Sequence, residues 1–405
     1  MIKKIKQIPM KKAKNKIVHK DGFMIDIASD PYGPEYVVKV SDRKLGMEGF
    51  LVVHNTALGP GKGGIRMMPD VSEEEVYRLA ETMTWKNALA GIPFGGAKAG
   101  IRWPGGPDKL KKQFIESFAR AIRPFLIKKY IAGPDVNTGE REMQWFAEAV
   151  GKWQVVTGKP ARYCLVTASG EKCGIPHEIG STGFGVAHAA RVAAEAMGID
   201  MKGARVSIHG FGNVGTFAYR HLTAMGAQVV AIADQYGAVY AENGFDAKIV
   251  ERMIAKRTSI IEHRGPGTRV IAAEDFWSVP VEIMVPASVT DVINDGNKGK
   301  IKTRLIVEGG NIVMREPIER ELFKRGIMIV PDFVANAGGV ISSYAEYRGM
   351  TTEKMFKLVE QKIVEATKAV VSESLRTKKY PREVALRIAR ERVEAATKKR
   401  AATFC

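Results

Sequence analysis

The pattern of hydrophobic and polar positions predicts a mixed first part of the chain. Apolar runs rich in β-branched residues at 35–40 and 49–58 predict strands. Residues 70–91 predict a helix, because their apolar positions recur with a helical period. Ser72 followed by Glu75 has the spacing of a capping box at its start.

One stripe of this predicted helix should face the core. Lys86 falls on the stripe, either snorkelling near the helix end or serving a site. After this helix we expect a loop containing Lys98, then a helix near 107–126 and a strand–turn–helix unit over 128–151. The apolar residues of the stripe are Val76, Leu79, Ala80, Met83 and Ala90.

From about residue 181 the pattern alternates between helices and strands, which predicts a parallel sheet buried on both faces. Helices are expected over 181–198, capped by Ser181 or Thr182, and over 213–226. Two long helices split near 377–384 end the chain. The expected parallel strands are 204–209, 228–234, 268–273, 281–287, 304–309 and 327–332. The chain therefore has the pattern of an α/β protein of 405 residues, long enough for more than one domain.

Composition narrows the class of protein. No apolar run of about 18 residues is present, so no membrane span is expected. The basic N-terminal stretch lacks the features of a secretory signal. The net charge of +18 is dispersed, and its denser patches at 3–20 and 396–404 lack interleaved aromatic residues, which argues against nucleic-acid binding. Cys164, Cys173 and Cys405 show neither zinc spacing nor a disulfide framework, so we expect no metal and a reducing cytoplasm.

A dinucleotide-binding fingerprint lies at the start of the alternating part. Gly210, Gly212 and Gly215 form GxGxxG between a predicted strand and a predicted helix, and Asp234 ends the next strand. The three glycines should permit a tight turn, close approach of a pyrophosphate and helix–strand packing, in that order. A carboxylate at Asp234 favours NAD, with NADP as the alternative if a nearby cation accepts its 2′-phosphate.

Three lysines precede the fingerprint in unusual settings. Lys62 and Lys98 lie among glycines, and Lys86 lies on the predicted buried stripe. Lys98 has no acidic residue between Gly91 and Arg102. Ala99 follows it where a phosphate loop needs Ser or Thr, so a P-loop is excluded. Such a cluster should lower lysine pKa values and bind an anion with more than one carboxylate.

Six segments, in order along the chain, resemble motifs of the glutamate/leucine/phenylalanine/valine dehydrogenases, and the glutamate-specific branch is the most similar. The resemblance implies reversible NAD(P)-dependent deamination of L-glutamate to 2-oxoglutarate and ammonium, with hydride crossing a cleft between domains. It also implies a homo-oligomer, usually a hexamer. The segments are KGGIR (62–66), EVYRLAETMTWKNALAGIPFGGAKAG (75–100), PDVNTGEREMQW (134–145), VTGKP (156–160), GFGNVG (210–215) and VPDFVANAGGVISSYAEY (330–347).

The same resemblance implies two domains. Residues 1–180 would bind substrate and oligomerise, with 371–405 packing back on them. Residues 181–370 would form a Rossmann-type domain for NAD(P).

Individual roles also follow from the resemblance. Lys98 would activate the water that attacks the imine carbon, and Asp135 would move protons to and from the amine. Lys86 would bind the α-carboxylate, while Lys62 and Ser343 would hold the side-chain carboxylate. The remaining candidates are Gly133 and Asn336 near the substrate, and Thr182, Gly210, Phe211, Gly212, Asn213, Val214, Gly215, Asp234, Ala287 and Asn311 near the dinucleotide.

The chain also departs from the family pattern. Ala99 replaces a glycine beside the catalytic lysine, and residues 161–185 lack an arginine pair that relatives carry. Gly133 stands where the glutamate enzymes have alanine, which suggests a roomier site. Three alternatives therefore remain: a dehydrogenase for another, larger or apolar, amino acid; a catalytically weak regulatory paralogue; and a nucleic-acid binder acting through the basic ends.

Overall fold

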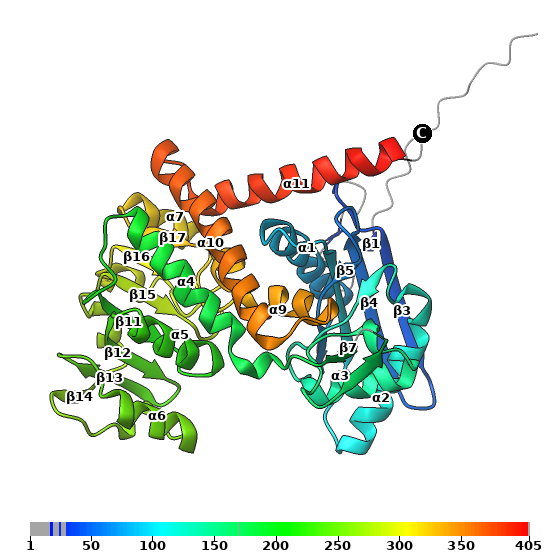
Figure 1. Ribbon diagram of the computed structural model, residues 1–405, viewed down its shortest axis with the longest axis horizontal. Helices are drawn as coiled ribbons and strands as arrows, with labels where there is room; N and C mark the ends of the chain where they lie inside the picture. Colours follow the sequence, from blue (N-terminus) through cyan, green and yellow to red (C-terminus); the bar gives the residue numbers. More distant parts are fainter. Residues whose placement is uncertain (1–16, 19–23, 26–29, 169, 404–405) are drawn as a thin grey trace, which may run out of the picture.

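The computed structural model describes residues 17–18, 24–25, 30–168 and 170–403. Most of the basic patch at 3–20, the last residue of the 396–404 patch and Cys405 lie outside the described residues. Within the described part, two large sheets form the cores of the two halves, with α9 (Gly338–Tyr347) and α10 (Thr352–Thr377) between them (Figure 1). No described helix is long and apolar enough to span a membrane.

The first half is built on a six-stranded sheet in the order β3-β4-β7-β5-β8, with β6 paired to β7. One face packs against α2 (Asp108–Ala121) and α3 (Glu140–Val150), and the other packs against α1 (Glu73–Leu89). The strands are β3 (Tyr36–Asp42), β4 (Met47–Asn55), β5 (Gly61–Lys62), β6 (Ile65–Met68), β7 (Gly95–Arg102) and β8 (Tyr130–Ile131).

The segment that holds Lys98 is strand β7 and not the expected loop. Its glycines make room for the protein's own backbone: a Cβ at Gly96 would lie 2.2 Å from the backbone nitrogen of Thr84 in α1. Gly63 likewise allows close approach, since a Cβ there would lie 1.7 Å from the carbonyl oxygen of Ala97. The run of small residues therefore brings α1 and the neighbouring strands close to the backbone of β7.

Helix α1 lies where it was predicted, and one of the two hydrogen bonds of the predicted capping box is present. The Ser72 hydroxyl accepts a hydrogen bond from the Glu75 backbone N–H at 3.1 Å. The Glu75 carboxylate does not return to Ser72, because it pairs with the Arg66 guanidinium. The buried stripe differs in detail, since Leu79 and Met83 are only half-buried.

The second half contains a seven-stranded sheet in the order β14-β13-β12-β11-β15-β16-β17. The strands β12, β11, β15, β16 and β17 are parallel neighbours, as predicted. The run at 268–273 pairs with none of these strands. It pairs antiparallel with β13, a strand that the sequence pattern did not reveal, and β13 pairs antiparallel with β12. The strands are β11 (Arg205–His209), β12 (Gln228–Asp234), β13 (Gly237–Ala241), β14 (Thr268–Ile271), β15 (Ile283–Pro286), β16 (Leu305–Val307) and β17 (Met328–Val330).

Helices cover both faces of this sheet. α4 (Ser181–Ala196) is capped by Gly180 and not by Ser181 or Thr182, because Gly180 has a left-handed φ of +86°. A Cβ at Gly180 would also lie 2.1 Å from the Phe217 ring, so glycine is required there twice over. The other helices are α5 (Asn213–Ala224), α6 (Ala247–Lys256), α7 (Glu316–Lys324) and α8 (Asp332–Ala335).

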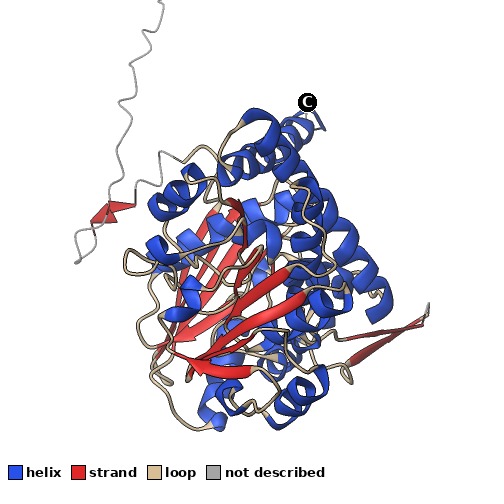
Figure 2. Ribbon diagram, turned by 90° about the vertical axis from the view of Figure 1, so that its left-hand side faces the viewer, coloured by secondary structure: helices blue, strands red, loops and turns tan. Residues whose placement is uncertain are grey.

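The last helix, α11 (Pro381–Thr403), joins the two halves. It contacts β17 near its start and runs over α1 (Figure 1). The Arg382 guanidinium pairs with the carboxylates of Glu308, Glu319 and Asp332 at 2.7 to 3.0 Å. These contacts fix α11 to the end of β16, to helix α7 and to the start of helix α8. Figure 2 shows, in addition, a short hairpin formed by β9 (Cys164–Thr167) and β10 (Gly170–Cys173) that projects from the body. A second short hairpin, β1 (Ile17–Val18) with β2 (Met24–Ile25), precedes the first sheet.

Candidate active site

The structure brings Lys98 and Asp135 together. The Lys98 ammonium lies 3.0 Å from Asp135 Oδ2, so the carboxylate that the local sequence lacks comes from the turn after β8. The Arg66 guanidinium donates to the same oxygen at 2.9 Å. Burial alone would raise the pKa of the Asp135 carboxyl, but Lys98 and Arg66 outweigh it and lower that pKa. Asp135 is therefore held as a partly buried carboxylate between two cations.

The turn that carries Asp135 is fixed by Thr138. The Thr138 hydroxyl donates to the Ile65 carbonyl oxygen at 2.7 Å, and it accepts from the Asp135 backbone N–H at 2.9 Å. Because Ile65 belongs to β6 and β6 pairs with β7, the carboxylate of Asp135 and the ammonium of Lys98 are positioned by the same sheet.

Lys62 lies on β5 beside β7 and is 3% exposed. Its ammonium donates to the Ala132 carbonyl oxygen at 2.9 Å. A Cβ at Gly133 would lie 2.3 Å from Lys62 Nζ. The space that Gly133 leaves is thus filled by this ammonium, which corrects the expectation of a roomier site. Burial lowers the pKa of Lys62 to about 7, and the charge of Lys98 lowers it in the same direction, against Glu346, which raises it.

Lys86 connects the first half to the second. Its ammonium reaches Asn336 Oδ1 at 2.5 Å, and the Asn336 side-chain amide donates to Asn311 Oδ1 at 2.9 Å. Burial lowers the pKa of Lys86 to about 8, and Asp332 opposes that shift. The Lys86 side chain contacts Asn336 and does not extend into solvent, which favours a role in a binding site over snorkelling. The expected lowering of lysine pKa values is confirmed for Lys62 and Lys86.

The three glycines of the fingerprint differ in their surroundings as expected. Gly210 has a left-handed φ of +98°, and a Cβ at Gly215 would lie 1.9 Å from the Gly210 carbonyl oxygen. At Gly212 a Cβ would meet no described atom within 4 Å. The strand–turn–helix geometry with an open middle glycine at the start of α5 fits a dinucleotide pyrophosphate.

Other residues expected at the dinucleotide surround this turn. The Val214 side chain would be 3.3 Å from a Cβ at Gly309, and the Ala287 carbonyl oxygen 2.6 Å from one at Gly210. Phe211 packs edge-on against Tyr219.

Asp234 lies at the end of β12, as predicted, and its carboxylate also has a structural role. One oxygen accepts from the Tyr236 backbone N–H at 2.8 Å. The other accepts from the Ser259 hydroxyl at 2.6 Å and the Ile260 backbone N–H at 2.8 Å. The carboxylate is half-exposed and orders the start of the short helix at Ile260–Glu262.

Ser343 on α9 lies beside a residue that the sequence did not identify. His177 Nε2 is 3.3 Å from Ser343 Oγ. Burial and the charges of Lys62 and Lys86 lower the pKa of the His177 imidazole to about 4. A Cβ at Gly339 would lie 3.2 Å from Thr182 Oγ1 and 3.9 Å from the same imidazole. His177 belongs to the stretch 161–185 that departs from the family pattern, so no motif could have marked it.

Two further ionic contacts hold residues of the site in place. Arg66 was part of a quoted motif without an assigned role, and its contact with Asp135 supplies one. The ammonium of Lys159 pairs with Glu346 at 2.6 Å, and both side chains are fully buried. The Glu346 carboxylate also accepts from the Gly158 backbone N–H at 2.7 Å. This pair joins the VTGKP segment to α9, which carries Ser343.

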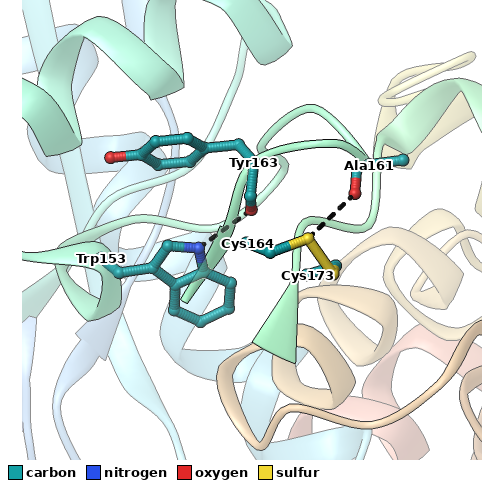
Figure 3. The surroundings of a disulfide bond; sticks show 5 residues. All are labelled: Trp153, Ala161, Tyr163, Cys164 and Cys173. Carbon is teal, nitrogen blue, oxygen red and sulfur yellow. Dashed lines mark hydrogen bonds between the residues drawn. A yellow bond between two sulfur atoms is a disulfide. The ribbon is translucent and has the colours of Figure 1, made fainter. Parts of the chain in front are cut away.

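A disulfide in the altered segment corrects the expectation of free cysteines. Cys164 and Cys173 face each other in the β9–β10 register, with Cα atoms 4.0 Å apart and an S–S bond of 2.05 Å (Figure 3). The Trp153 indole N–H donates to the Tyr163 carbonyl oxygen at 3.1 Å at the base of the hairpin. Their sequence spacing gave no signal, because the hairpin that aligns them was not recognised. Cys405 lies outside the described residues.

Ala99 does not crowd the candidate catalytic lysine. Neighbouring residues on a strand point to opposite faces of the sheet, so Ala99 points away from the side chain of Lys98. It is fully buried in the cluster with Leu51, Phe118 and Phe146 under α2 and α3. The departure that motivated a weak paralogue thus lies in the core.

Comparison with known proteins agrees with this geometry. The family described as Glutamate/Leucine/Phenylalanine/Valine dehydrogenase matches residues 173–401, and the Glu/Leu/Phe/Val dehydrogenase dimerisation domain matches residues 34–152. Glutamate dehydrogenase of Aeropyrum pernix is 37% identical over 374 residues, covering 87% of this chain and 86% of its own. NADP-specific glutamate dehydrogenase of Saccharolobus shibatae is 35% identical over 408 residues, covering 94% and 93%. The structure of hetero-hexameric glutamate dehydrogenase from Thermus thermophilus aligns with a TM-score of 0.77 and 27% identity, covering 91% and 90%.

Proposed function

Since the chain belongs to the Glu/Leu/Phe/Val dehydrogenase family, we propose that it catalyses reversible NAD(P)-dependent oxidative deamination of L-glutamate to 2-oxoglutarate and ammonium. The observation that carries the choice of glutamate is Lys62. It is a buried ammonium whose hydrogen-bond partner is a backbone carbonyl, so a second carboxylate on the substrate would complete its environment.

The proposed roles divide the two carboxylates of the substrate between two lysines. Lys86 binds the α-carboxylate, and Lys62 binds the side-chain carboxylate together with the Ser343 hydroxyl. An apolar side chain would leave the Lys62 ammonium buried and unpaired, which selects against leucine or phenylalanine. Gly133 supports this choice, since its missing Cβ leaves the space that the Lys62 ammonium uses.

Lys98 and Asp135 are the proposed catalytic pair. Lys98, as the neutral amine, would take a proton from the water that attacks the imine carbon, and the Asp135 carboxylate would take and return the amine proton. Their 3.0 Å contact allows a proton to pass between them. The Arg66 guanidinium, which donates to the same Asp135 oxygen, would hold this carboxyl group in place during the transfer.

The cofactor site uses the turn at residues 210–215, with Ala287, Asn311 and Thr182 beside it. Bound NAD(P) would supply the hydride acceptor, and Asn336 would lie near its nicotinamide end. Curated relatives include both NADP-specific and NAD-specific enzymes. The carboxylate of Asp234 favours NAD on this chain, because it would repel a 2′-phosphate.

We also propose a homohexamer and a cytoplasmic location. A hexameric assembly is supported by the similarity of this chain to the hetero-hexameric glutamate dehydrogenase of Thermus thermophilus. The cytoplasm is supported by the need for NAD(P), and the Cys164–Cys173 disulfide is the observation that argues for a more oxidising setting. The proposed division into residues 1–180 with 371–405, and residues 181–370, is supported by the two separate sheets.

A substrate panel tests the proposal. Purified protein is assayed at saturating NAD and NADP with glutamate, norvaline, leucine, methionine and phenylalanine, following reduced coenzyme by absorbance. Glutamate should give the highest kcat/KM. Lys62→Leu combined with Ser343→Val should lose glutamate activity and gain activity on methionine or norvaline. A wild type that prefers a monocarboxylic amino acid would overturn the substrate assignment.

A further inference from the structure

His177 is placed to influence how Ser343 binds the substrate. Its Nε2 atom lies 3.3 Å from Ser343 Oγ, within reach of a hydrogen bond. It comes from a short helical turn, His177–Ile179, which precedes α4 and follows the disulfide hairpin. No role for this residue follows from the family motifs quoted above, because the surrounding segment is the part of the chain that departs from them.

The turn that presents His177 is held on both sides. The Gly180 backbone N–H donates to the His177 carbonyl oxygen at 3.3 Å, which closes the turn. The Asn213 side-chain amide donates to the Glu178 carbonyl oxygen at 3.1 Å, which ties the turn to the start of α5. The imidazole is thus carried on backbone that is anchored to the dinucleotide half, while it contacts the side chain of Ser343 on α9.

The surroundings of the imidazole favour its neutral form. Burial lowers the pKa of His177 to about 4, and the charges of Lys62 and Lys86 act in the same direction. A neutral imidazole carries a single N–H. When that proton is on Nε2, the ring donates to Ser343 Oγ, and the hydroxyl proton of Ser343 is left to donate elsewhere.

We propose that His177 is a positioning residue that donates to Ser343 Oγ and so directs the Ser343 hydroxyl proton toward the side-chain carboxylate of a dicarboxylic amino acid. The inference rests on the proposed function and adds a specificity-determining residue to it. The side-chain end of the substrate is then bound by one cation, Lys62, and one oriented hydroxyl, Ser343. A monocarboxylic substrate would gain nothing from the orientation of that hydroxyl.

The test compares His177→Ala, His177→Phe and His177→Gln with wild type on glutamate and on norvaline, which lacks the second carboxylate. Loss of one neutral hydrogen bond corresponds to about a threefold to tenfold effect on binding. His177→Ala and His177→Phe should raise KM for glutamate by that factor, with kcat changed less than twofold and KM for norvaline unchanged. His177→Gln keeps an N–H donor at a similar reach and should restore most of the affinity. Glu178→Ala, an exposed change in the same turn, is the matched control and should behave as wild type.

A double-mutant comparison isolates the contact. In a Ser343→Ala background, His177→Ala should have no further effect on KM for glutamate, because the hydroxyl it positions is gone. Equal losses on glutamate and norvaline, or a full additional loss in the Ser343→Ala background, would overturn the inference. If the wild type prefers glutamate and His177→Ala has an unchanged KM for glutamate, the inference about His177 is overturned and the proposed function is not. A wild type without glutamate activity would instead contradict the proposed function itself.

Discussion

The affinity for dicarboxylates should fall steeply above pH 7. Burial lowers the pKa of Lys62 to about 7 and that of Lys86 to about 8. A lysine binds a carboxylate as the ammonium, and that form is lost as the pH rises through the pKa. Above its pKa, each of these lysines must therefore take up a proton before it can bind a carboxylate.

The size of the effect follows from the two pKa values. The dissociation constant of a dicarboxylate should be flat below pH 7, rise about tenfold per unit from pH 7 to 8, and rise about a hundredfold per unit above pH 8. From pH 7 to 9, deprotonation of Lys62 weakens binding about tenfold in each of two pH units, and deprotonation of Lys86 does so in one. The dissociation constant therefore rises about a thousandfold in total, which is about 4 kcal/mol. A lysine with an ordinary pKa near 10.5 would give no change over this range.

Glutarate is a suitable probe, because it has both carboxylates and no amine to oxidise. Its inhibition constant against glutamate is measured from pH 6 to 9.5 in wild type and in Lys62→Met, which keeps the side-chain length and removes the charge. The variant should bind glutarate more weakly and lose the rise between pH 7 and 8, while it keeps the rise above pH 8. Pentanoate, with one carboxylate, should show the single rise of Lys86 in both proteins. A wild-type inhibition constant that stays level from pH 7 to 9, or identical profiles in wild type and variant, would refute the assignment.

Three further outcomes are expected. Lys98→Ala and Asp135→Asn should each lower kcat by about 10²- to 10⁴-fold with coenzyme binding unchanged by fluorescence titration, and a variant that keeps a tenth of wild-type kcat would not be catalytic. The kcat/KM for NAD should exceed that for NADP by at least about tenfold, about 1.4 kcal/mol, and Asp234→Asn should narrow the ratio; a wild-type preference for NADP would contradict this. Alkylation of denatured, unreduced protein from cells lysed with a thiol-blocking reagent should leave Cys164 and Cys173 unlabelled, and labelling of both would show that the pair is reduced in the cell.

The parts of the fold predicted from sequence are those with strong local patterns. α1, α3, α5 and five parallel strands lie where periodicity placed them, because each pattern is encoded within one element. The strand β13 was missed, since its five residues give too short a pattern. β7 was interpreted as a loop because glycine and alanine are poor strand formers; here they are selected by the close approach of α1 and the neighbouring strands.

The candidate site, like the fold, could be predicted only where one short stretch of sequence carries the signal. The lysines could be singled out because an uncompensated cation among small residues is unusual wherever it occurs. The partner of Lys98 could not be found from spacing, since Lys98 lies on β7 and Asp135 lies on the turn after β8, which is held beside Ile65 of β6. His177 left no sequence signal at all, because its significance comes from a contact with Ser343 on α9, more than 150 residues away.

The small residues of β7 link the packing of the fold to the chemistry of the site. Gly96 allows α1 to lie against the sheet at Thr84, and Lys86 extends from the same helix to Asn336 of the second half. Lys62, which pairs with Gly96 between β5 and β7, is 3% exposed. Burial is the largest cause of both lowered lysine pKa values, so burial affects the charge of these two lysines more than neighbouring acids do. The Asp135 carboxylate pairs with the Lys98 ammonium. The Lys62 and Lys86 ammoniums instead have a backbone oxygen and an amide oxygen, respectively, as their hydrogen-bond partners. A ligand with two carboxylates would supply what these two ammoniums lack, and this is why we propose glutamate over a monocarboxylic amino acid as the substrate.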